Sequence, residues 1–345
     1  MSCIDVMKNF KELLGVILLM LLCGCVQDGK PEEFAGKAEI EQGGLTVSVK
    51  YETAAVKSLA GYEPATTDES VVYRLDILVF DAVSKMLERS AYMSALPDSV
   101  DFELPVGEKL VYVVVNGPDL DRVQNLGSML ELAEDLSSRN YIRDGFVMVG
   151  YQNCTVTSGV VSKPEIVVKR LVSRVELRSV KCNVPVQYDS MRVESVFLGN
   201  AHSVQSLSGT VSVEVNKGGY ADTDKKQAIG RDGVVGACGA YMYREPGSVV
   251  KVGETSTQPV YLYCQPDSGK VSTCLYMRVA IGDGRYYYRV PLDKGLPANT
   301  TCVVDAVITN LGTKEPFDGD VQKGEIQAVV KVMDWLTGEE YHAEF

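Results

Sequence analysis

Residues 43–51, GGLTVSVKY, alternate between apolar and polar side chains. The apolar side chains fall on one face of an extended chain, and they are Leu45, Val47, Val49 and Tyr51. The polar side chains between them fall on the other face, and they are Thr46, Ser48 and Lys50. Successive side chains of a β-strand point to opposite faces, so this period of two predicts a strand with one face in a core.

The same alternation recurs along most of the chain. Residues 71–82, VVYRLDILVFDA, continue it with Val71, Tyr73, Leu75, Ile77 and Val79. Further strand-like segments are DFELPV (101–106), KLVYVVVNG (109–117), GFVMVG (145–150), EIVVKRLVSRVELRSV (165–180), SMRVESVFLGN (190–200), GTVSVEV (209–215), PVYLYC (259–264), CLYMRVAIG (274–282), RYYYRVPL (285–292), TCVVDAVITNLG (301–312) and EIQAVVKVMDW (325–335). Short strands separated by Gly, Pro and Asn turns predict an all-β chain of antiparallel sandwiches.

One segment has helical spacing instead. In residues 119–136, DLDRVQNLGSMLELAEDL, the apolar positions follow a repeat near 3.6 and are Leu120, Val123, Leu126, Leu130 and Leu136. Asp119 follows a Gly-Pro pair and is a suitable cap for the first turn. We therefore expect one helix among the strands.

The length of the chain is sufficient for two medium-sized domains. We place the boundary near Val180, which gives an N-terminal domain of residues 45–179 and a C-terminal domain of residues 180–345. The formal net charge is −12. This charge argues against nucleic acid or an anionic membrane surface as a partner, because both require a basic face.

The first residues read as an export signal. The stretch GVILLMLLCGCVQDGK (15–30) contains most of an apolar run that extends from Leu13 through Val26, about 14 residues and fewer than the roughly 20 that a spanning helix needs. Lys8 and Lys11 precede it and small residues follow it, as in a secretory signal peptide. The tetrad Leu-Cys-Gly-Cys at 22–25 resembles a bacterial lipobox, so we interpret residues 1–24 as the signal and Cys25 as the lipidated residue. Residues 25–44 then form a tether. The alternatives are an unmodified Cys25 or a C-x-C metal pair, which lacks further ligands nearby.

Enzymatic chemistry has few candidates. The chain has two histidines, His202 and His342, and neither lies in a nucleophile or metal motif. We therefore expect no catalytic residues, no metal and no cofactor. Cys264 and Cys274 flank a Pro-Asp-Ser-Gly turn and are placed either for a cross-strand disulfide or as buried free thiols.

The segment Glu52–Ser70, ETAAVKSLAGYEPATTDES, has the composition of a loop between two predicted strands. At 19 residues it exceeds the length above which such loops are usually functional or disordered. Long exposed loops are targets of proteases. Its basic residue Lys57, and Arg74 just beyond it, are candidate processing positions.

Together these segments resemble the Bacteroidales fimbrillins, the type V pilin subunits. The most specific pieces are KRLVSRVEL (169–177) and the ending ITNLGTKEP (308–316) with EIQAVVKVMDW (325–335). The resemblance implies two transthyretin-like sandwiches, export as a lipoprotein through Cys25 and a fimbrium at the outer membrane surface that supports adhesion. It also implies that a protease removes the first strand, residues 45–51. A strand from the next subunit's C-terminal end then fills the groove, so other fimbrial subunits are the expected partners. In this chain the donor positions are Ile326, Ala328, Val330 and Val332.

Two alternatives remain open. Stalk pilins carry an arginine in the loop after the first strand, where this chain has Lys57, so the chain is also compatible with an uncleaved anchor or tip subunit. Outside the family, the tyrosines Tyr286, Tyr287 and Tyr288 suggest a sugar-binding platform on a surface glycan-binding lipoprotein.

Overall fold

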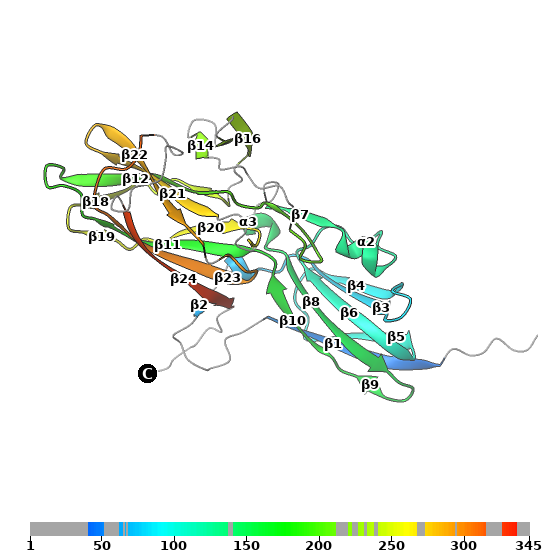
Figure 1. Cartoon of the computed structure of the whole chain (residues 1–345). Helices are drawn as coiled ribbons and strands as arrows, with labels where there is room; N and C mark the ends of the chain where they lie inside the picture. The colour runs from blue at the N-terminus through cyan, green and yellow to red at the C-terminus, as the bar shows by residue number, and fades with distance from the viewer. Residues whose placement is uncertain are drawn as a thin grey trace, which may run out of the picture. The chain divides into compact units, whose positions relative to one another are not determined.

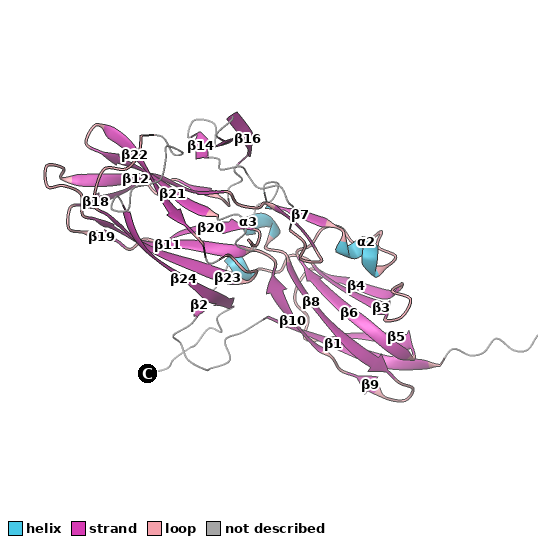
Figure 2. Ribbon diagram, in the orientation of Figure 1, coloured by secondary structure: helices cyan, strands magenta, loops and turns pink. Residues whose placement is uncertain are grey.

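The computed structural model describes residues 41–51, 62–64, 66, 68–136, 141–211, 220–222, 227–230, 233–237, 241–267, 273–293, 295–314 and 326–336. Nearly all regular structure in these residues is β, which confirms the predicted all-β class (Figures 1 and 2). No helix in the described residues has the length and apolar character to cross a membrane. The predicted signal peptide, Cys25 and most of the predicted tether lie outside the described residues.

The first sheet folds back on itself around a core. Its strand order is β4 (Leu87–Met93), β3 (Leu75–Asp81), β6 (Gly107–Val115), β8 (Met148–Val156), β10 (Glu165–Arg170), β1 (Gln42–Tyr51) and β5 (Val100–Pro105), and β9 (Val161–Ser162) also pairs with β1. β8 and β10 share only two residue pairs, Val149 with Lys169 and Met148 with Arg170. This narrow junction joins two halves of the sheet whose inner faces enclose a cluster of aliphatic side chains from β1, β3, β5, β6, β8 and β10.

β3 is buried on both faces, which its alternating pattern does not reveal. Leu75, Ile77 and Val79 lie in the inner core, while Leu78 and Phe80 pack on the outer face. Residues of the segment 120–130 cover that outer face. The predicted strand starts too early, because β3 begins at Leu75 and Tyr73 is exposed.

The predicted helix over 119–136 is wrong in extent. The structure has only α2 (Leu126–Leu130), whose first turn is capped by Asn125 through a hydrogen bond accepted from the Ser128 amide, and β7 (Ala133–Asp135) follows it. The Leu126 amide donates to the Lys85 carbonyl, and the Gln124 carbonyl accepts from the Leu87 amide. These bonds to the β3–β4 turn use backbone groups that a helix starting at Asp119 would need, so the apolar residues cover the sheet in an irregular conformation.

Two further sheets pack around a second, larger core. One has the order β19 (Thr255–Ser256), β11 (Ser173–Cys182), β23 (Thr300–Ile308), β24 (Ile326–Leu336) and β2 (Tyr62–Pro64), with β20 (Val260–Cys264) also on β11. The other has the order β17 (Tyr243–Arg244), β12 (Ser190–Gly199), β21 (Cys274–Ile281) and β22 (Gly284–Pro291), with β18 (Ser248–Lys251) also on β12. Buried side chains from both sheets form one hydrophobic cluster. This is the arrangement of a β-sandwich.

Small elements complete the described chain. They are η1 (Asp68–Ser70), α3 (Tyr141–Asp144), the pair of β7 with β13 (Val204–Ser206), and a three-stranded sheet of β14 (Tyr220–Asp222), β15 (Gln227–Gly230) and β16 (Gly233–Ala237).

The segment 165–180, read as one continuous strand, is divided between two sheets. β10 ends at Arg170 in the first sheet, and β11 begins at Ser173 in the six-stranded sheet. Residues Glu41–Phe345 form one compact unit and are not divided near Val180 by their contacts. The domain boundary near Val180 stays a prediction.

Candidate strand-exchange site

β1 is an interior strand although it lies near the start of the described chain. It pairs antiparallel with β5 from Gln42 opposite Pro105 to Val47 opposite Val100. On its other edge it pairs parallel with β10 from Ser48 opposite Glu165 to Tyr51 opposite Val168. Loss of β1 would leave unpaired backbone groups on both neighbours, and such edges are templates for another strand.

The apolar face of β1 fills the first core, as the sequence predicts. Leu45, Val47 and Val49 are 1%, 0% and 5% exposed, and the side chains between them are only half-buried or exposed. At roughly 1.5–3 kcal/mol for each fully buried aliphatic side chain, the three contribute about 5–9 kcal/mol as an upper estimate.

Tyr51, the fourth predicted position, lies where β1 ends. Its side chain is partly buried, and its hydroxyl donates a hydrogen bond of 2.9 Å to the Ser70 carbonyl. Burial raises the pKa of Tyr51, and the Arg170 charge nearby opposes this rise. The end of β1 is therefore attached to η1, at the C-terminal end of the segment predicted to be processed.

Gly43 allows the start of β1 to approach its neighbours closely. A Cβ atom at this position would lie 2.5 Å from the Thr157 carbonyl oxygen and 2.7 Å from Cγ1 of Val156. Any side chain would collide with backbone there, so glycine is required by space rather than by an unusual backbone conformation.

The segment Glu52–Ser70 is not a continuous loop. β2 and η1 both lie within it, whereas Lys57 lies outside the described residues. β2 pairs parallel with the end of β24, from Tyr62 opposite Asp334 to Pro64 opposite Leu336.

Arg74, the second candidate processing position, is held by several contacts. Its Nε atom is 2.7 Å from Oδ2 of Asp76, and its Nη2 atom is 3.0 Å from Oδ1 of the same carboxylate. The guanidinium lies 4.9 Å from the ring centroid of Tyr92. The amides of Tyr73 and Arg74 both donate to Oδ1 of Asn116, at 2.8 and 3.2 Å. A protease must bind its substrate in an extended, accessible form, and these contacts oppose that at Arg74.

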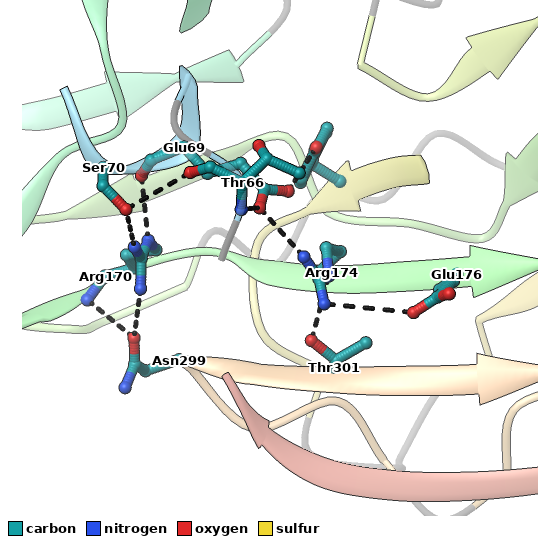
Figure 3. A network of polar contacts seen from close by, with 9 residues as sticks. Thr66, Glu69, Ser70, Arg170, Arg174, Glu176, Asn299 and Thr301 are labelled. Carbon is teal, nitrogen blue, oxygen red and sulfur yellow. Dashed lines mark hydrogen bonds and ion pairs between the residues drawn. The ribbon is translucent and has the colours of Figure 1, made fainter. Parts of the chain in front are cut away.

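A buried polar network lies at the C-terminal end of the predicted processing segment (Figure 3). Glu69 is 0% exposed, and its Oε2 atom accepts a hydrogen bond of 2.9 Å from Nη1 of Arg174. Its Oε1 atom accepts a bond of 2.6 Å from the Tyr263 hydroxyl, and Oε2 also accepts from the Thr66 amide at 2.6 Å. A buried carboxylate needs a partner charge and hydrogen bonds, and Glu69 has both.

Two arginines on neighbouring strands surround this carboxylate. Arg174, on β11, also donates from Nε to Oγ1 of Thr301 at 3.0 Å. Arg170, at the end of β10, donates from Nε to the Glu69 carbonyl at 3.2 Å and from Nη2 to Oγ of Ser70 at 3.2 Å. Burial lowers the pKa of Arg170 to about 10, and the Glu69 charge opposes this change. The network thus joins η1 to β10 of the first sheet and to β11 of the six-stranded sheet, close to where the chain passes from one sheet to the other at residues 170–173.

Sequence reasoning missed this network. The alternation in Arg174-Val175-Glu176-Leu177 places the two charged side chains on the polar face, which would normally be exposed, whereas the structure buries Arg174 and Glu176. The partners of Arg174, Glu69 and Thr301, are more than 100 residues away from it, and no local pattern pairs residues at that distance.

The predicted donor strand is already paired within the chain. β24 pairs antiparallel with β23 from Ile326 opposite Ile308 to Asp334 opposite Thr300. Ile326 and Val330 pack against the second core, but Ala328 is exposed. The side chain of Val332 lies outside the described residues. Among the described pairings, the other edge of β24 contacts only β2, so residues 326–333 carry no ladder on that side.

The cysteines described by the structure are all free: Cys154, Cys182, Cys264, Cys274 and Cys302. Of the two arrangements open for Cys264 and Cys274, the structure has the buried free thiols. Burial raises the pKa of both.

The tyrosines on β22 do not form an exposed platform. Tyr288 is 0% exposed, and its hydroxyl donates to the Asn310 carbonyl at 2.7 Å. The Lys314 ammonium lies 3.9 Å from the ring centroid of Tyr286. Tyr287 pairs through its backbone with Thr313 and is only partly exposed. This arrangement does not favour the glycan-binding alternative.

The histidines stay unassigned. His202 is half-buried in an isolated bridge with Gln265, and His342 lies outside the described residues. Within the described residues, no group of three or more His, Cys, Asp or Glu side chains is placed to hold a metal ion.

Solved structures share this architecture. A candidate cell adhesion protein from Parabacteroides distasonis superposes with a TM-score of 0.62 at 16% identity, covering 86% of this chain and 99% of that one. A candidate cell adhesion protein from Bacteroides eggerthii gives 0.62 at 14% identity, covering 86% and 97%. A fimbrillin from Porphyromonas gingivalis gives 0.57 at 13% identity, covering 86% and 98%. This chain has the fimbrillin fold.

No protein-family model matches the sequence. No curated protein matches it either. The fimbrillin fold therefore rests on the three-dimensional likeness.

Proposed function

We propose that this chain is a structural subunit of a cell-surface fimbrium that polymerises by protease-triggered strand exchange and supports adhesion. It is exported as a lipoprotein through Cys25, and its partners are other fimbrial subunits. The single observation that carries the proposal is the position of β1. A strand near the start of the chain is hydrogen-bonded on both edges and contributes three buried aliphatic side chains to a core. The fimbrillin fold adds support.

The acceptor is the space that β1 occupies. Release of β1 exposes the edges of β5 and β10 together with three apolar holes left by Leu45, Val47 and Val49. A partner strand that restores the backbone ladder and fills the holes binds by strand addition.

Processing upstream of Glu69 agrees with the contacts better than processing at Arg74. A cut after Arg74 would remove Glu69 together with β1 and leave the Arg174 guanidinium buried without this carboxylate. Loss of one member of a buried ion pair costs about 3–5 kcal/mol. A cut at Lys57 or nearby leaves the pair intact, so we place processing between Tyr51 and Thr66.

The donor is β24. Its positions Ile326, Ala328, Val330 and Val332 repeat the every-second-residue apolar pattern of β1. Donation requires β24 to leave β23, with which it shares a nine-residue ladder, and enter the groove of another subunit. Donor and acceptor are different surfaces, so contacts run head to tail and propagate a filament.

The uncleaved anchor or tip role is a second candidate, because Lys57 stands where stalk pilins carry arginine. Mass spectrometry of surface-extracted protein separates the roles. A mature N-terminus between residues 52 and 66 supports a stalk subunit, whereas lipid retained on Cys25 supports an anchor.

Deletion of residues 325–345 tests the donor. Polymers that resist detergent should disappear from cells that express the truncated chain, while circular dichroism checks that the monomer keeps its β content. A folded truncated chain that still forms polymers would exclude β24 as the donor.

A further inference from the structure

We infer that Glu69 is an anchor that keeps the new N-terminal segment seated after processing. The anchor consists of Glu69 with its partners Arg174, Tyr263, Arg170 and Ser70. The inference rests on the proposed function, because it assumes that β1 is released by a cut before Thr66. It concerns what happens to the chain that remains.

Processing would leave the segment between the cut and β3 as the new N-terminal end of the subunit. Residues 66–74 would become a free end joined to the fold only on one side, and chain ends are poorly ordered unless they are attached. Before processing, the Tyr51 hydroxyl also contacts this segment through the Ser70 carbonyl, and that bond is lost with β1. The remaining contacts must hold the segment alone.

The anchor contacts come from strands that processing does not remove. The Glu69 carboxylate is held by Arg174 on β11 and by Tyr263 on β20, and the Glu69 carbonyl is held by Arg170 on β10. A second hydrogen-bonded position follows at Asn116, whose Nδ2 atom donates to the Val71 carbonyl at 2.8 Å. All of these partners remain in a chain that begins before Thr66.

The location of Arg170 gives the anchor a further consequence. Arg170 lies in β10, the strand that pairs with β1 along one side of the groove, and its register partner on β8 is Met148. The Arg170 amide and side chain also reach Oδ1 of Asn299, at 3.2 and 3.5 Å. Because Glu69 and Ser70 hold the same guanidinium, the anchor also fixes the end of the acceptor edge while the groove is empty.

The test uses the full chain with residues 54–60 replaced by the recognition site of a site-specific protease. Hydrogen exchange of backbone amides in residues 68–74 is measured by mass spectrometry before and after the cut. In the otherwise unchanged protein, the cut should alter this exchange by less than about twofold. In the Glu69→Gln variant, the cut should accelerate it by about tenfold or more, because local opening governs exchange.

The control is Glu131→Gln, the same chemical change at an exposed side chain that follows α2 and lies outside β1 and its neighbouring strands. It should behave like the unchanged protein. Tyr263→Phe removes only the hydroxyl that donates to Glu69 and should give an intermediate acceleration, which keeps the test decisive if the Gln variant folds poorly. Rapid exchange in the cut, unchanged protein would overturn the inference. Exchange in both anchor variants as slow as in the control would also overturn it. Polymer formation by the same cut samples tests the proposed function separately.

Discussion

Glu69 and Arg174 meet at 2.9 Å although they are 105 residues apart in the chain, and their side chains are 0% and 2% exposed. The pair joins the segment before β3 to the start of β11 in the six-stranded sheet. A buried pair of this kind is weak evidence for net stabilisation, but breaking it by removing one partner is costly.

The Arg174→Met variant should lower the free energy of unfolding by about 3–5 kcal/mol, because it leaves the buried carboxylates of Glu69 and Glu176 without the guanidinium that pairs with them. Urea denaturation monitored by circular dichroism measures the change. The double variant Glu69→Gln with Arg174→Met should recover part of the loss, since no carboxylate is then left at position 69 without the Arg174 guanidinium. Strictly additive losses in the double variant would contradict the coupling.

Val47→Ala should destabilise the uncleaved chain by about 2 kcal/mol, because Val47 is fully buried in the first core and truncation leaves a cavity. Ser48→Ala on the opposite face is the control and should change stability by less than about 0.5 kcal/mol. Equal losses in the two variants would mean that β1 is not seated through the face formed by Leu45, Val47 and Val49.

Val330→Asp should reduce polymer formation at least about tenfold, whereas Val329→Asp should leave it near the normal level. Val330 packs on the second core and belongs to the proposed donor face, while Val329 is 57% exposed on the other face of β24. A charge in a groove built for aliphatic side chains carries a large desolvation cost. Detergent-resistant ladders on gels measure polymer formation. Equal ladders from both variants would contradict the proposal that the face of β24 with Val330 enters the groove.

Protonation of Asp305 on β23 should destabilise the protein in acid. β23 is the strand that pairs with β24. Hydrogen bonds from Arg178 lower the pKa of this carboxyl, and Ser179 and the charges of Arg178 and Lys331 add to the effect. A carboxyl with a depressed folded-state pKa stabilises the protein above its unfolded pKa of 3.8, and this contribution is lost as pH falls through the folded value. Asp305→Asn should therefore melt at a lower temperature than the unchanged protein at pH 7, and the difference should shrink toward pH 2. A gap that stays constant over that range would contradict this origin.

Cys264 and Cys274 should stay unmodified by iodoacetamide at pH 8 in the native protein, because both thiols are buried and burial raises their pKa. Cys154, which is half-buried, should react faster. Peptide mapping after brief alkylation measures all three. A peptide pair joined through Cys264 and Cys274 under oxidising conditions would show that the two thiols can bond.

The sequence predicts best the strands whose burial is one-sided. β1 satisfies its alternating pattern residue by residue, because its inner face meets a core and its outer face does not. The pattern fails for β3, where Leu78 and Phe80 are buried by a covering segment from elsewhere in the chain. It also fails over 119–136, where backbone hydrogen bonds to the turn around Lys85 replace the helix that the spacing favours.

The candidate site divides in the same way. The apolar face of β1 can be read locally, and so can the alternation of β24. The local sequence does not reveal the break between β10 and β11, because the break depends on β10 joining one sheet and β11 another. It does not reveal the partner of Arg174 either, because Glu69 is distant in the sequence. The pairing of β24 with β2 cannot be predicted locally either, because β2 lies more than 250 residues earlier in the chain. Its pairing with β23 joins strands that are neighbours in the sequence.

The pairing of β1 also sets a direction. β1 runs parallel to β10 and antiparallel to β5, so the two walls of the groove are unlike, and a replacement strand that restores both ladders can enter in only one orientation. Every junction in a fibre built this way points along the same axis. A fibre formed by the proposed exchange would therefore have two chemically distinct tips, one with a vacant groove and one with an unused tail, and blocking either should halt a different stage of growth.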